Sequence, residues 1–314
     1  MDQIIDALLQ SLSETINKPS TKALFQGKDY HEIPFNQSNF NPITPIKGKL
    51  AFVDGGNAEI LSAVNFSLQF FRIYYCIYEN NKLLKQDKKE FFALINSIPK
   101  NNKIFFQTKL FQSDLEIPLI QSTEVESLAS VADLIRRAAE IEITKEINSE
   151  YVILDGNLKA DAEFIRELLK NKTLYALSKT NELYTDSGNS LTVELSTLSP
   201  FDSWQYTNLV KISSKMHNAD IVITKLHPLS KYIFKLETPK DTDLNIIPVL
   251  ASNSTDPVFL GYPYGLVQAD KHARVSNQEK EYFKVKLLTS SKNKEKLSQY
   301  LNTINAHNIL DSIL

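Results

Sequence analysis

Cysteine is nearly absent from this chain, because Cys76 is the only one among its 314 residues. A single thiol excludes a disulfide framework and a zinc site built on several cysteines. This usage is typical of a reducing compartment, and we expect a cytoplasmic location. A metal site in this chain therefore needs ligands other than cysteine.

Long apolar runs are also missing. No stretch reaches about 18 uncharged apolar residues, the length that a membrane-spanning helix needs. The first 18 residues alternate acidic and apolar side chains and lack the basic segment and cleavage site of a signal peptide. The sequence therefore argues against a membrane span and against a membrane partner.

An excess of charge of one sign is missing as well. The chain has 35 basic and 37 acidic residues, a formal net charge of −2. A protein that is coated with nucleic acid over its whole surface is usually more basic than this. A local basic channel remains compatible with the composition.

Glycine is scarce, with 8 residues where average usage of about 7% would give about 22. Five of the eight form three clusters, which are Gly55 with Gly56, Gly156, and Gly261 with Gly265. Aspartate directly precedes the first two clusters and follows the third after a few residues. We expect tight backbone packing at these positions, beside carboxylates.

The first part of the chain is predicted to alternate strands and helices. A helix is expected over 2–17 and an irregular, proline-containing segment over 18–46. Asn80 and Asn81 predict a turn, and Ser122 or Thr123, with Glu126, predicts a capping box. The expected order is strands over 49–56, 62–79 and 103–111, a helix over 122–147, a strand over 151–156, a helix over 160–170 and a strand over 174–179.

The remainder of the chain also has α/β patterning. Helices are expected over 203–214, 264–275 and 291–312, and strands over 219–226, 231–237, 244–251, 257–262 and 281–288. No Pro/Gly/Ser-rich linker divides the chain. We therefore expect an N-terminal helix and irregular arm over 1–47 and one compound domain over 48–314.

Four carboxylates lie on this framework at points where they can converge. Asp54 ends the first strand, Asp155 ends the fourth, Glu140 lies on the helix between them, and Asp270 follows the GYPYG segment. Hard oxygen ligands of this kind suit Mg²⁺ or Mn²⁺ and not zinc. Two such ions about 4 Å apart can activate water and stabilise the leaving oxygen in phosphodiester hydrolysis.

Each carboxylate also has a simpler interpretation. An aspartate before glycine is most often a turn residue, which applies to Asp54 and Asp155. Glu140 fits an exposed helix charge, although its neighbours Ala138, Ala139 and Ile141 are apolar. Asp270 fits a residue that starts or decorates a helix.

The order of these motifs resembles that of the NurA nuclease family. The segment FVDGG matches the family's Asp-Gly-Ser at Asp54, with Gly56 in place of serine, and LIRRAAE matches an acidic helix position at Glu140. VILDGNL matches a strand ending in Asp-Gly at Asp155, and ALSKT matches a lysine at Lys179. GYPYGLVQAD matches the family's GYP and the later Ala-His pair, so that Tyr262 aligns with the tyrosine and Asp270 stands where the family has histidine.

The resemblance covers about residues 48–276 and implies a fold, an activity and partners. The implied fold is RNase H-like: a mixed sheet flanked by helices, here with additional strands and a C-terminal helix. The implied activity is metal-dependent exonuclease action on DNA ends, together with endonuclease action on single strands. It implies metal ligands at Asp54, Glu140, Asp155 and Asp270, a homodimer, and a HerA-type hexameric ATPase that drives DNA to the nuclease.

Several assignments stay open at this point. Lys179 either neutralises a scissile phosphate or is solvated, and Tyr262 either orients a ligand or packs in the core. Arg136 and Arg137 line a DNA path or belong to the helix surface. His272 is an alternative to Asp270, but on a helix it would point about 200° away from it.

Two other function classes are weighed against the nuclease. The same fold could be a catalytically inactive adaptor of a DNA-translocase complex, whose site has decayed at position 270. An ATP-binding actin-like or sugar-kinase fold also starts from a strand with an Asp-Gly turn. That fold needs further glycine-rich phosphate loops, and the scarcity of glycine argues against it.

Overall fold

The computed structural model describes residues 1–16, 18–122, 125–170, 173–179, 183–290 and 295–296. By its internal contacts the chain divides into two compact units. The first unit comprises Met1–Phe52, Cys76–Lys85 and Ile147–Gln268, and the second comprises Val53–Tyr75, Gln86–Glu146 and Ala269–Leu314. None of the helices in the described ranges combines the length and the apolar character that crossing a membrane requires.

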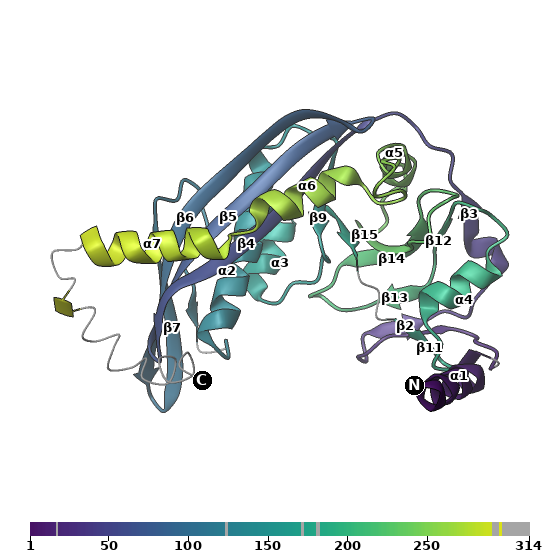
Figure 1. Cartoon of the computed structure of the whole chain (residues 1–314), viewed down its shortest axis with the longest axis horizontal. Coiled ribbons are helices and arrows are strands. Elements are labelled where there is room, and N and C mark those ends of the chain that lie inside the picture. The colour runs from purple at the N-terminus through teal and green to yellow at the C-terminus, as the bar shows by residue number, and fades with distance from the viewer. Residues whose placement is uncertain (17, 123–124, 171–172, 180–182, 291–294, 297–314) are drawn as a thin grey trace. The chain divides into compact units, whose positions relative to one another are not determined.

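The chain has the predicted α/β fold, with a mixed sheet flanked by helices (Figure 1). The main sheet has eleven strands in the order β3-β12-β14-β15-β10-β9-β4-β5-β6-β7-β8. Strands β9 and β10 are parallel, whereas β10 with β15 and β6 with β7 are antiparallel. Strands β4, β5 and β6 each contribute residues to both units.

The first unit contains strands β3, β9, β10, β12, β14 and β15 of this sheet, the two-stranded sheets β1-β11 and β2-β13, and most of the helices. Its core cluster includes Trp204, Tyr206, Leu191 and Leu195. Its strands are β1 Ala23–Leu24, β2 Tyr30–Glu32, β3 Phe40–Pro42, β9 Tyr151–Asp155, β10 Tyr175–Ser178, β11 Tyr184–Thr185, β12 Trp204–Tyr206, β13 Val210–Ile212, β14 Ala219–Lys225 and β15 Phe234–Pro239. Its helices are α1 Asp2–Ile16, α3 Glu163–Leu169, α4 Leu191–Leu198, α5 Ile246–Ser252 and the first half of α6 Tyr264–Ala273.

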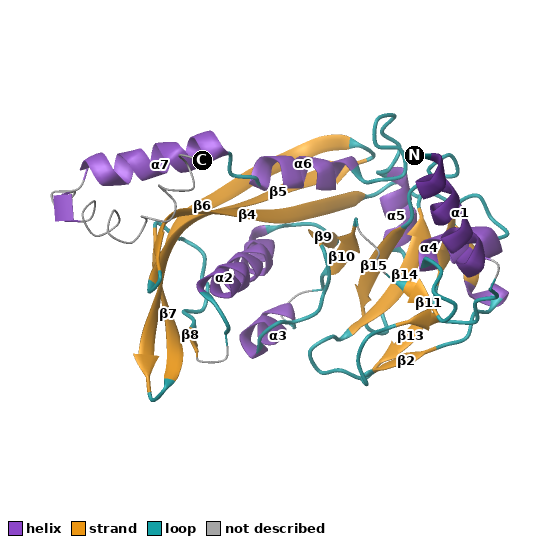
Figure 2. Cartoon of the chain, turned by 60° about the horizontal axis from the view of Figure 1, so that its bottom comes forward, coloured by secondary structure: helices purple, strands orange, loops and turns teal. Residues whose placement is uncertain are grey.

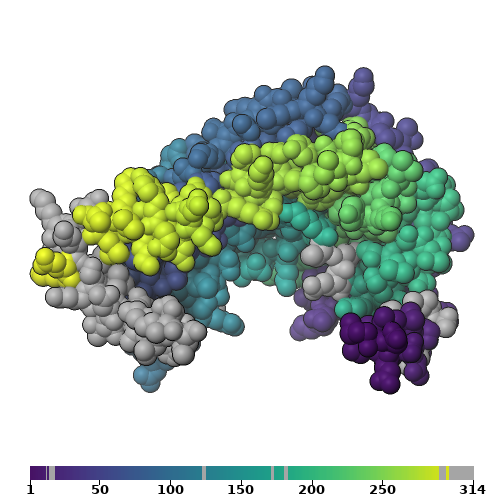
Figure 3. All heavy atoms as spheres, viewed as in Figure 1, coloured from purple at the N-terminus to yellow at the C-terminus, as the bar shows by residue number. Residues whose placement is uncertain are grey.

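Helix α1 confirms the helix expected over 2–17, and it lies at the surface (Figure 3). Its apolar side chains Ile4, Ile5, Leu8 and Leu9 are each more than half exposed. The amphipathic pattern therefore predicts the helix but not a buried face.

The second unit contains most of the four long strands of the sheet, together with the two-residue strand β8 at its edge. They are β4 Lys49–Ala63, β5 Phe66–Glu79, β6 Lys82–Lys100, β7 Lys103–Phe111 and β8 Gln121–Ser122, accompanied by α2 Leu128–Ile143 and α7 Asn277–Ser290. Helices α2 and α7 lie on opposite faces of the long strands (Figure 2). Phe70 of β5 packs against Phe283 of α7, with ring centroids 4.4 Å apart. Because both faces are covered, most residues of β5 are buried, and apolar and aromatic side chains predominate in its sequence.

Several predicted elements differ from the structure. The helix over 203–214 is wrong: β12 and β13 occupy it, because Trp204, Tyr206, Val210 and Ile212 are buried with the period of two that defines strands. The strand over 244–251 is wrong because α5 lies there, with Pro248 tolerated in its first turn. Residues 257–262 form no strand, and 281–288 lie within α7.

Two further boundaries differ, and one prediction cannot be compared. The first strand does not end at Gly56 but continues as β4 to Ala63. Helix α2 begins at Leu128 and is capped by Ser127, whose side chain accepts a hydrogen bond from the Ser130 amide. Of the two predicted caps, Ser122 belongs to strand β8, and Thr123 lies outside the described residues. The closing helix expected over 291–312 falls, apart from residues 295 and 296, outside the described residues.

Candidate metal centre

Strand β4 presents Asp54 next to two glycines that let helices approach both of its faces. Successive residues of a strand face opposite sides, so Asp54 and Gly56 share one face and Gly55 lies on the other. A Cβ atom at Gly56 would collide with the Ala273 carbonyl oxygen at the end of α6. A Cβ atom at Gly55 would lie 2.7 Å from Glu140 Oε1 of α2. The two missing side chains thus bring α6 to the face that carries Asp54 and α2 to the opposite face.

Helix α6 makes a second close approach to β4. A Cβ atom at Gly265, near the start of the helix, would collide with the ring of Phe52, two residues before Asp54. The glycine contacts at both ends of α6 lay this helix along β4. Asp270 lies between these two contacts and is thereby held beside Asp54.

Asp155 is positioned by a buried parallel strand pair. Val152, Ile153 and Leu154 of β9 are fully buried, and β10 pairs with this strand up to Asp155 itself. Gly156 follows with a φ of +112°, a conformation that favours glycine, and its amide donates to the Leu177 carbonyl oxygen. The turn after β9 therefore fixes Asp155 at the end of its strand.

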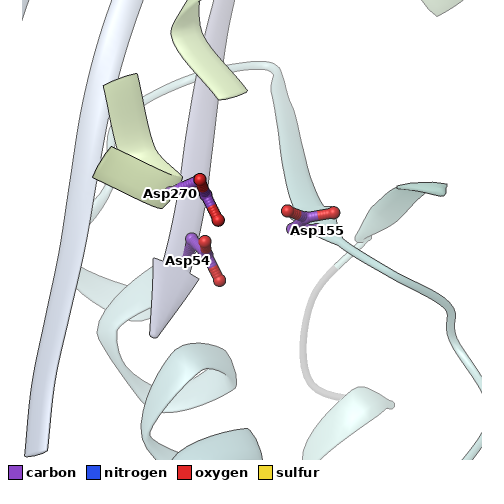
Figure 4. Close-up of side chains that lie close together, drawn as sticks. All are labelled: Asp54, Asp155 and Asp270. Atoms are coloured by element: carbon purple, nitrogen blue, oxygen red, sulfur yellow. The ribbon is translucent and has the colours of Figure 1, made fainter. Parts of the chain in front are cut away.

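The structure brings three of the four predicted carboxylate ligands together. Asp54, Asp155 and Asp270 each offer one carboxylate oxygen, and these oxygens all lie within 4.8 Å of one another (Figure 4). They come from β4, from the end of β9 and from α6. Two oxygen ligands on opposite sides of one Mg²⁺ are about 4.2 Å apart, since each bond is about 2.1 Å long. The donor set therefore fits a hard divalent cation after small side-chain movements.

Three carboxylates this close repel one another, and neighbouring positive groups offset that repulsion. Lys179 Nζ lies 2.6 Å from Asp155 Oδ2, and an Arg274 guanidinium nitrogen lies 2.7 Å from Asp270 Oδ2. The Gly55 amide donates to Asp54 Oδ1 at 2.8 Å. Lys179 therefore contacts the acidic group, but its catalytic role stays a prediction, and Arg274 was not predicted at all. The i,i+4 spacing of Asp270 and Arg274 on the predicted helix is the sequence signal from which this ion pair could have been predicted.

Glu140 is not a member of the group of three aspartates. Its side chain is 3% exposed and is held by Arg136 at 2.5 Å and by Arg137 at 3.2 Å. The charge of Glu140, helped by Asp133 and Asp54, raises the pKa of Arg136. Glu140 contacts β4 at Gly55, on the face away from Asp54. Arg136 and Arg137 therefore serve this ion-pair cluster, and a role for Glu140 as a metal ligand stays a prediction.

Tyr262 and His272 pack against aromatic rings. Tyr262 is 8% exposed, and its ring centroid lies 5.0 Å from that of Phe234. His272 stacks on Tyr74 with centroids 4.9 Å apart. Neither residue belongs to the group of three aspartates, and a catalytic role for Tyr262 stays a prediction.

No protein-family model matches the sequence, and no curated protein matches it. Among solved structures, the NurA nuclease from Sulfolobus solfataricus aligns with a TM-score of 0.58 over 93% of this chain and 95% of that one, at 14% identity. This likeness confirms the expected fold. Endonuclease V of Ciona intestinalis, in complex with DNA, and the catalytic domain of human endonuclease V align with TM-scores of 0.39 and 0.38 at 10% identity. They cover 86% and 91% of this chain and 96% and 98% of theirs.

Proposed function

We propose that this protein is a metal-dependent DNA nuclease. The observation that carries the proposal is the group formed by Asp54, Asp155 and Asp270, whose carboxylate oxygens lie within 4.8 Å of one another. The group stands on a fold similar to that of a NurA nuclease. All three donors are carboxylate oxygens, which favours Mg²⁺ or Mn²⁺ as the cofactor.

The chemistry divides between the cation and the side chains. A bound divalent cation would supply an activated water and neutralise charge on the leaving oxygen of a phosphodiester. Asp54, Asp155 and Asp270 would hold that cation. Lys179, in contact with Asp155, orients this carboxylate and offers a positive charge to a backbone phosphate.

The finer features of the proposal come from the motif resemblance. They are exonuclease action on DNA ends, endonuclease action on single strands, a homodimer, and a HerA-type hexameric translocase as partner. A cytoplasmic location is proposed from the single cysteine and not from the motifs. A net charge of −2 agrees with a partner that contributes much of the affinity for DNA. A pull-down with any ATPase that is encoded next to this protein would test the partnership.

The first prediction tests the acidic group. Asp54→Asn and Asp155→Asn each keep the side-chain shape but remove the charge that holds the cation, so each should lower cleavage of labelled DNA by at least about a hundredfold. Asp202→Asn is the matched control, because Asp202 is an exposed aspartate outside the acidic group. Circular dichroism should show all three variants folded. Full activity of either site variant at saturating Mn²⁺ would sink the assignment.

The same assay separates the nuclease from the inactive adaptor. Mn²⁺ or Mg²⁺ should support cleavage by the wild type, Zn²⁺ should not, and chelation with EDTA should abolish it. Cleavage that survives exhaustive chelation would contradict a metal mechanism. A wild-type protein that cuts no DNA with either ion, while it still binds the translocase, would be the adaptor.

A further inference from the structure

A second candidate site lies within the first unit, and its chemistry differs from that of the group of aspartates. A cavity of about 780 Å³ is lined by the loop after β9, by α3 and by the segments around residues 212–218 and 239–240. Four of its lining residues are cationic, and none is acidic: Arg166, Lys170, Lys215 and Lys240. A hollow with this lining attracts anions.

Two of the four cations are free to bind an anion, whereas Arg166 and Lys170 are paired with glutamates, Lys170 with Glu167 at 2.7 Å. Lys215 and Lys240 are exposed, and neither makes an ion pair or a side-chain hydrogen bond within the described part of the chain. Arg166 pairs with Glu163 and Glu167, but its Nε is buried and has no hydrogen-bond partner among the described residues. A buried donor without a partner is costly, and an anion in the pocket is a ready acceptor for it.

The rest of the lining combines apolar surface with hydrogen-bonding groups. Leu158, Ile212, Met216 and Pro239 supply the apolar part, and the polar part includes Ser213, Ser214, Thr173 and Asn218. A ligand that suits all three kinds of surface has a flat apolar ring system, a polar sugar-like portion and a phosphate. A nucleotide has this composition, and the cavity volume lies in the range of about 300–1,000 Å³ that is typical of small-molecule sites.

The loop that forms one wall of the pocket is anchored rather than open. The Leu158 amide donates to Glu237 Oε2 at 2.7 Å, and the Ala160 amide donates to the Met216 carbonyl oxygen at 2.7 Å. Glu237 is in turn fixed by His217 and Lys235, each at 2.8 Å. A preformed wall lowers the ordering cost of binding.

From this lining we infer that the pocket binds a nucleotide unit through its phosphate, either free or at the phosphorylated end of a DNA strand. Lys215 and Lys240 hold the phosphate, and the apolar wall carries the base. The site contains no carboxylate ligand and needs no divalent cation, so it goes beyond the proposed cleavage chemistry and can be tested without it.

The experiment is calorimetric titration of protein stripped of divalent ions at low salt. The ligands are dAMP, deoxyadenosine, inorganic phosphate and a 5′-phosphorylated oligonucleotide. The pocket variant is Lys215→Gln with Lys240→Gln. The control is Lys211→Gln with Lys231→Gln, two exposed lysines of the same unit outside the pocket. The pocket variant should bind dAMP at least tenfold more weakly than wild type, the control should bind like wild type, and deoxyadenosine should bind more weakly than dAMP.

The ligands also separate the two sources of the nucleotide. Lysine-dependent binding of dAMP supports a free nucleotide, and lysine-dependent binding of the oligonucleotide alone supports a strand end. Inorganic phosphate binding as tightly as dAMP, binding that ignores the lysines, or no binding of either nucleotide ligand would overturn the inference. Asp54→Asn should keep nucleotide binding, so failure of the cleavage proposal and failure of this one are distinguishable.

Discussion

Asp270 is the residue at which this sequence departs from the NurA motif, and the structure places it with Asp54 and Asp155. We predict that Asp270→Ala lowers cleavage by orders of magnitude, because a ligand of the cation is lost. Asp270→His should keep part of the activity, since an imidazole restores the residue that the family has. Single-turnover cleavage with Mn²⁺ measures both variants.

The control for this prediction is Lys271→Ala, an exposed neighbour on the same helix. If Asp270→Ala cuts as fast as wild type, Asp270 is only a helix-surface residue paired with Arg274. If the wild type is nearly inactive and Asp270→His raises activity, the site has decayed at this position.

A substitution at Glu140 distinguishes a metal ligand from a carboxylate that only forms a structural ion pair. Glu140→Gln leaves Arg136 and Arg137 without their buried partner, and we expect a loss of about 2–4 kcal/mol in the free energy of unfolding. Chemical denaturation measures that loss. The affinity of the folded variant for Mn²⁺, followed by electron paramagnetic resonance, should stay within about threefold of wild type, because the three aspartates that would hold the ion are unchanged. A threefold change in affinity is less than 1.4 kcal/mol, which corresponds to tenfold. A loss of Mn²⁺ affinity with unchanged stability would instead make Glu140 a ligand.

Short motifs pointed to Asp54, Asp155 and Asp270, but only Asp155 ends its strand, whereas Asp54 lies inside β4 and Asp270 lies within α6. The sequence could not separate Glu140 from them. That separation depends on which face of β4 each neighbour occupies, and the alternation of Asp54, Gly55 and Gly56 becomes informative only once the strand is known to continue through them.

At the level of elements, the pair of glycines in β4 illustrates why the predicted turn was wrong. Asp-Gly usually marks a turn, yet here the glycines lie inside a strand that runs to Ala63, because helices pack directly on its backbone. We predict that Gly56→Ala pushes the end of α6 away from β4 and separates Asp270 from Asp54. Cleavage should fall at least tenfold, with a stability loss of about 1–3 kcal/mol.

The matched control is Gly48→Ala, whose Cβ would lie 2.7 Å from Val249 Cγ1 of α5 in the first unit. It should cost similar stability, measured by denaturant unfolding, and leave the cleavage rate close to that of wild type. Equal loss of activity in both variants would mean that Gly56 matters only for folding.

Other elements were mispredicted because a short apolar run does not reveal its period. Residues 281–288 alternate like a strand, but they belong to helix α7. Two of its side chains, Phe283 and Leu288, pack against the cluster that contains Phe70. No strand was predicted over β6, because residues 82–90 are mostly charged or polar; in the structure almost all of them are exposed. The regular structure of β6 comes from pairing with neighbouring strands and not from its own composition.

At the scale of the whole molecule, the α/β class and the order of elements around the aspartates were accessible from the sequence. Periodicity and turn residues act locally, and they carry this information. The division into two units was not accessible, because β4, β5 and β6 pass from one unit to the other without a linker. The expected boundary between an arm over 1–47 and a domain over 48–314 stays a prediction.

The response of the whole fold to acid depends on a buried network in the first unit. Glu237 is fully buried, accepts hydrogen bonds from His217 and the Leu158 amide, and pairs with Lys235. Burial alone would raise the pKa of Glu237, but the hydrogen bond from His217 and the charge of Lys235 lower it to about 2. The unfolded chain has the ordinary glutamate pKa of 4.5.

A carboxylate whose pKa is depressed by folding stabilises the native state above the unfolded pKa. We therefore predict that the contribution of Glu237 is complete above pH 4.5 and is lost as the pH falls toward 2. A shift from 4.5 to about 2 corresponds to about 3 kcal/mol. The free energy of unfolding, measured with denaturant from pH 7 to pH 2.5, should fall more steeply in wild type than in Glu237→Gln. The variant should be less stable at pH 7, whereas the exposed control Glu116→Gln should follow wild type at every pH. Parallel curves for wild type and Glu237→Gln below pH 4.5 would show that this network does not set the acid limit of the fold.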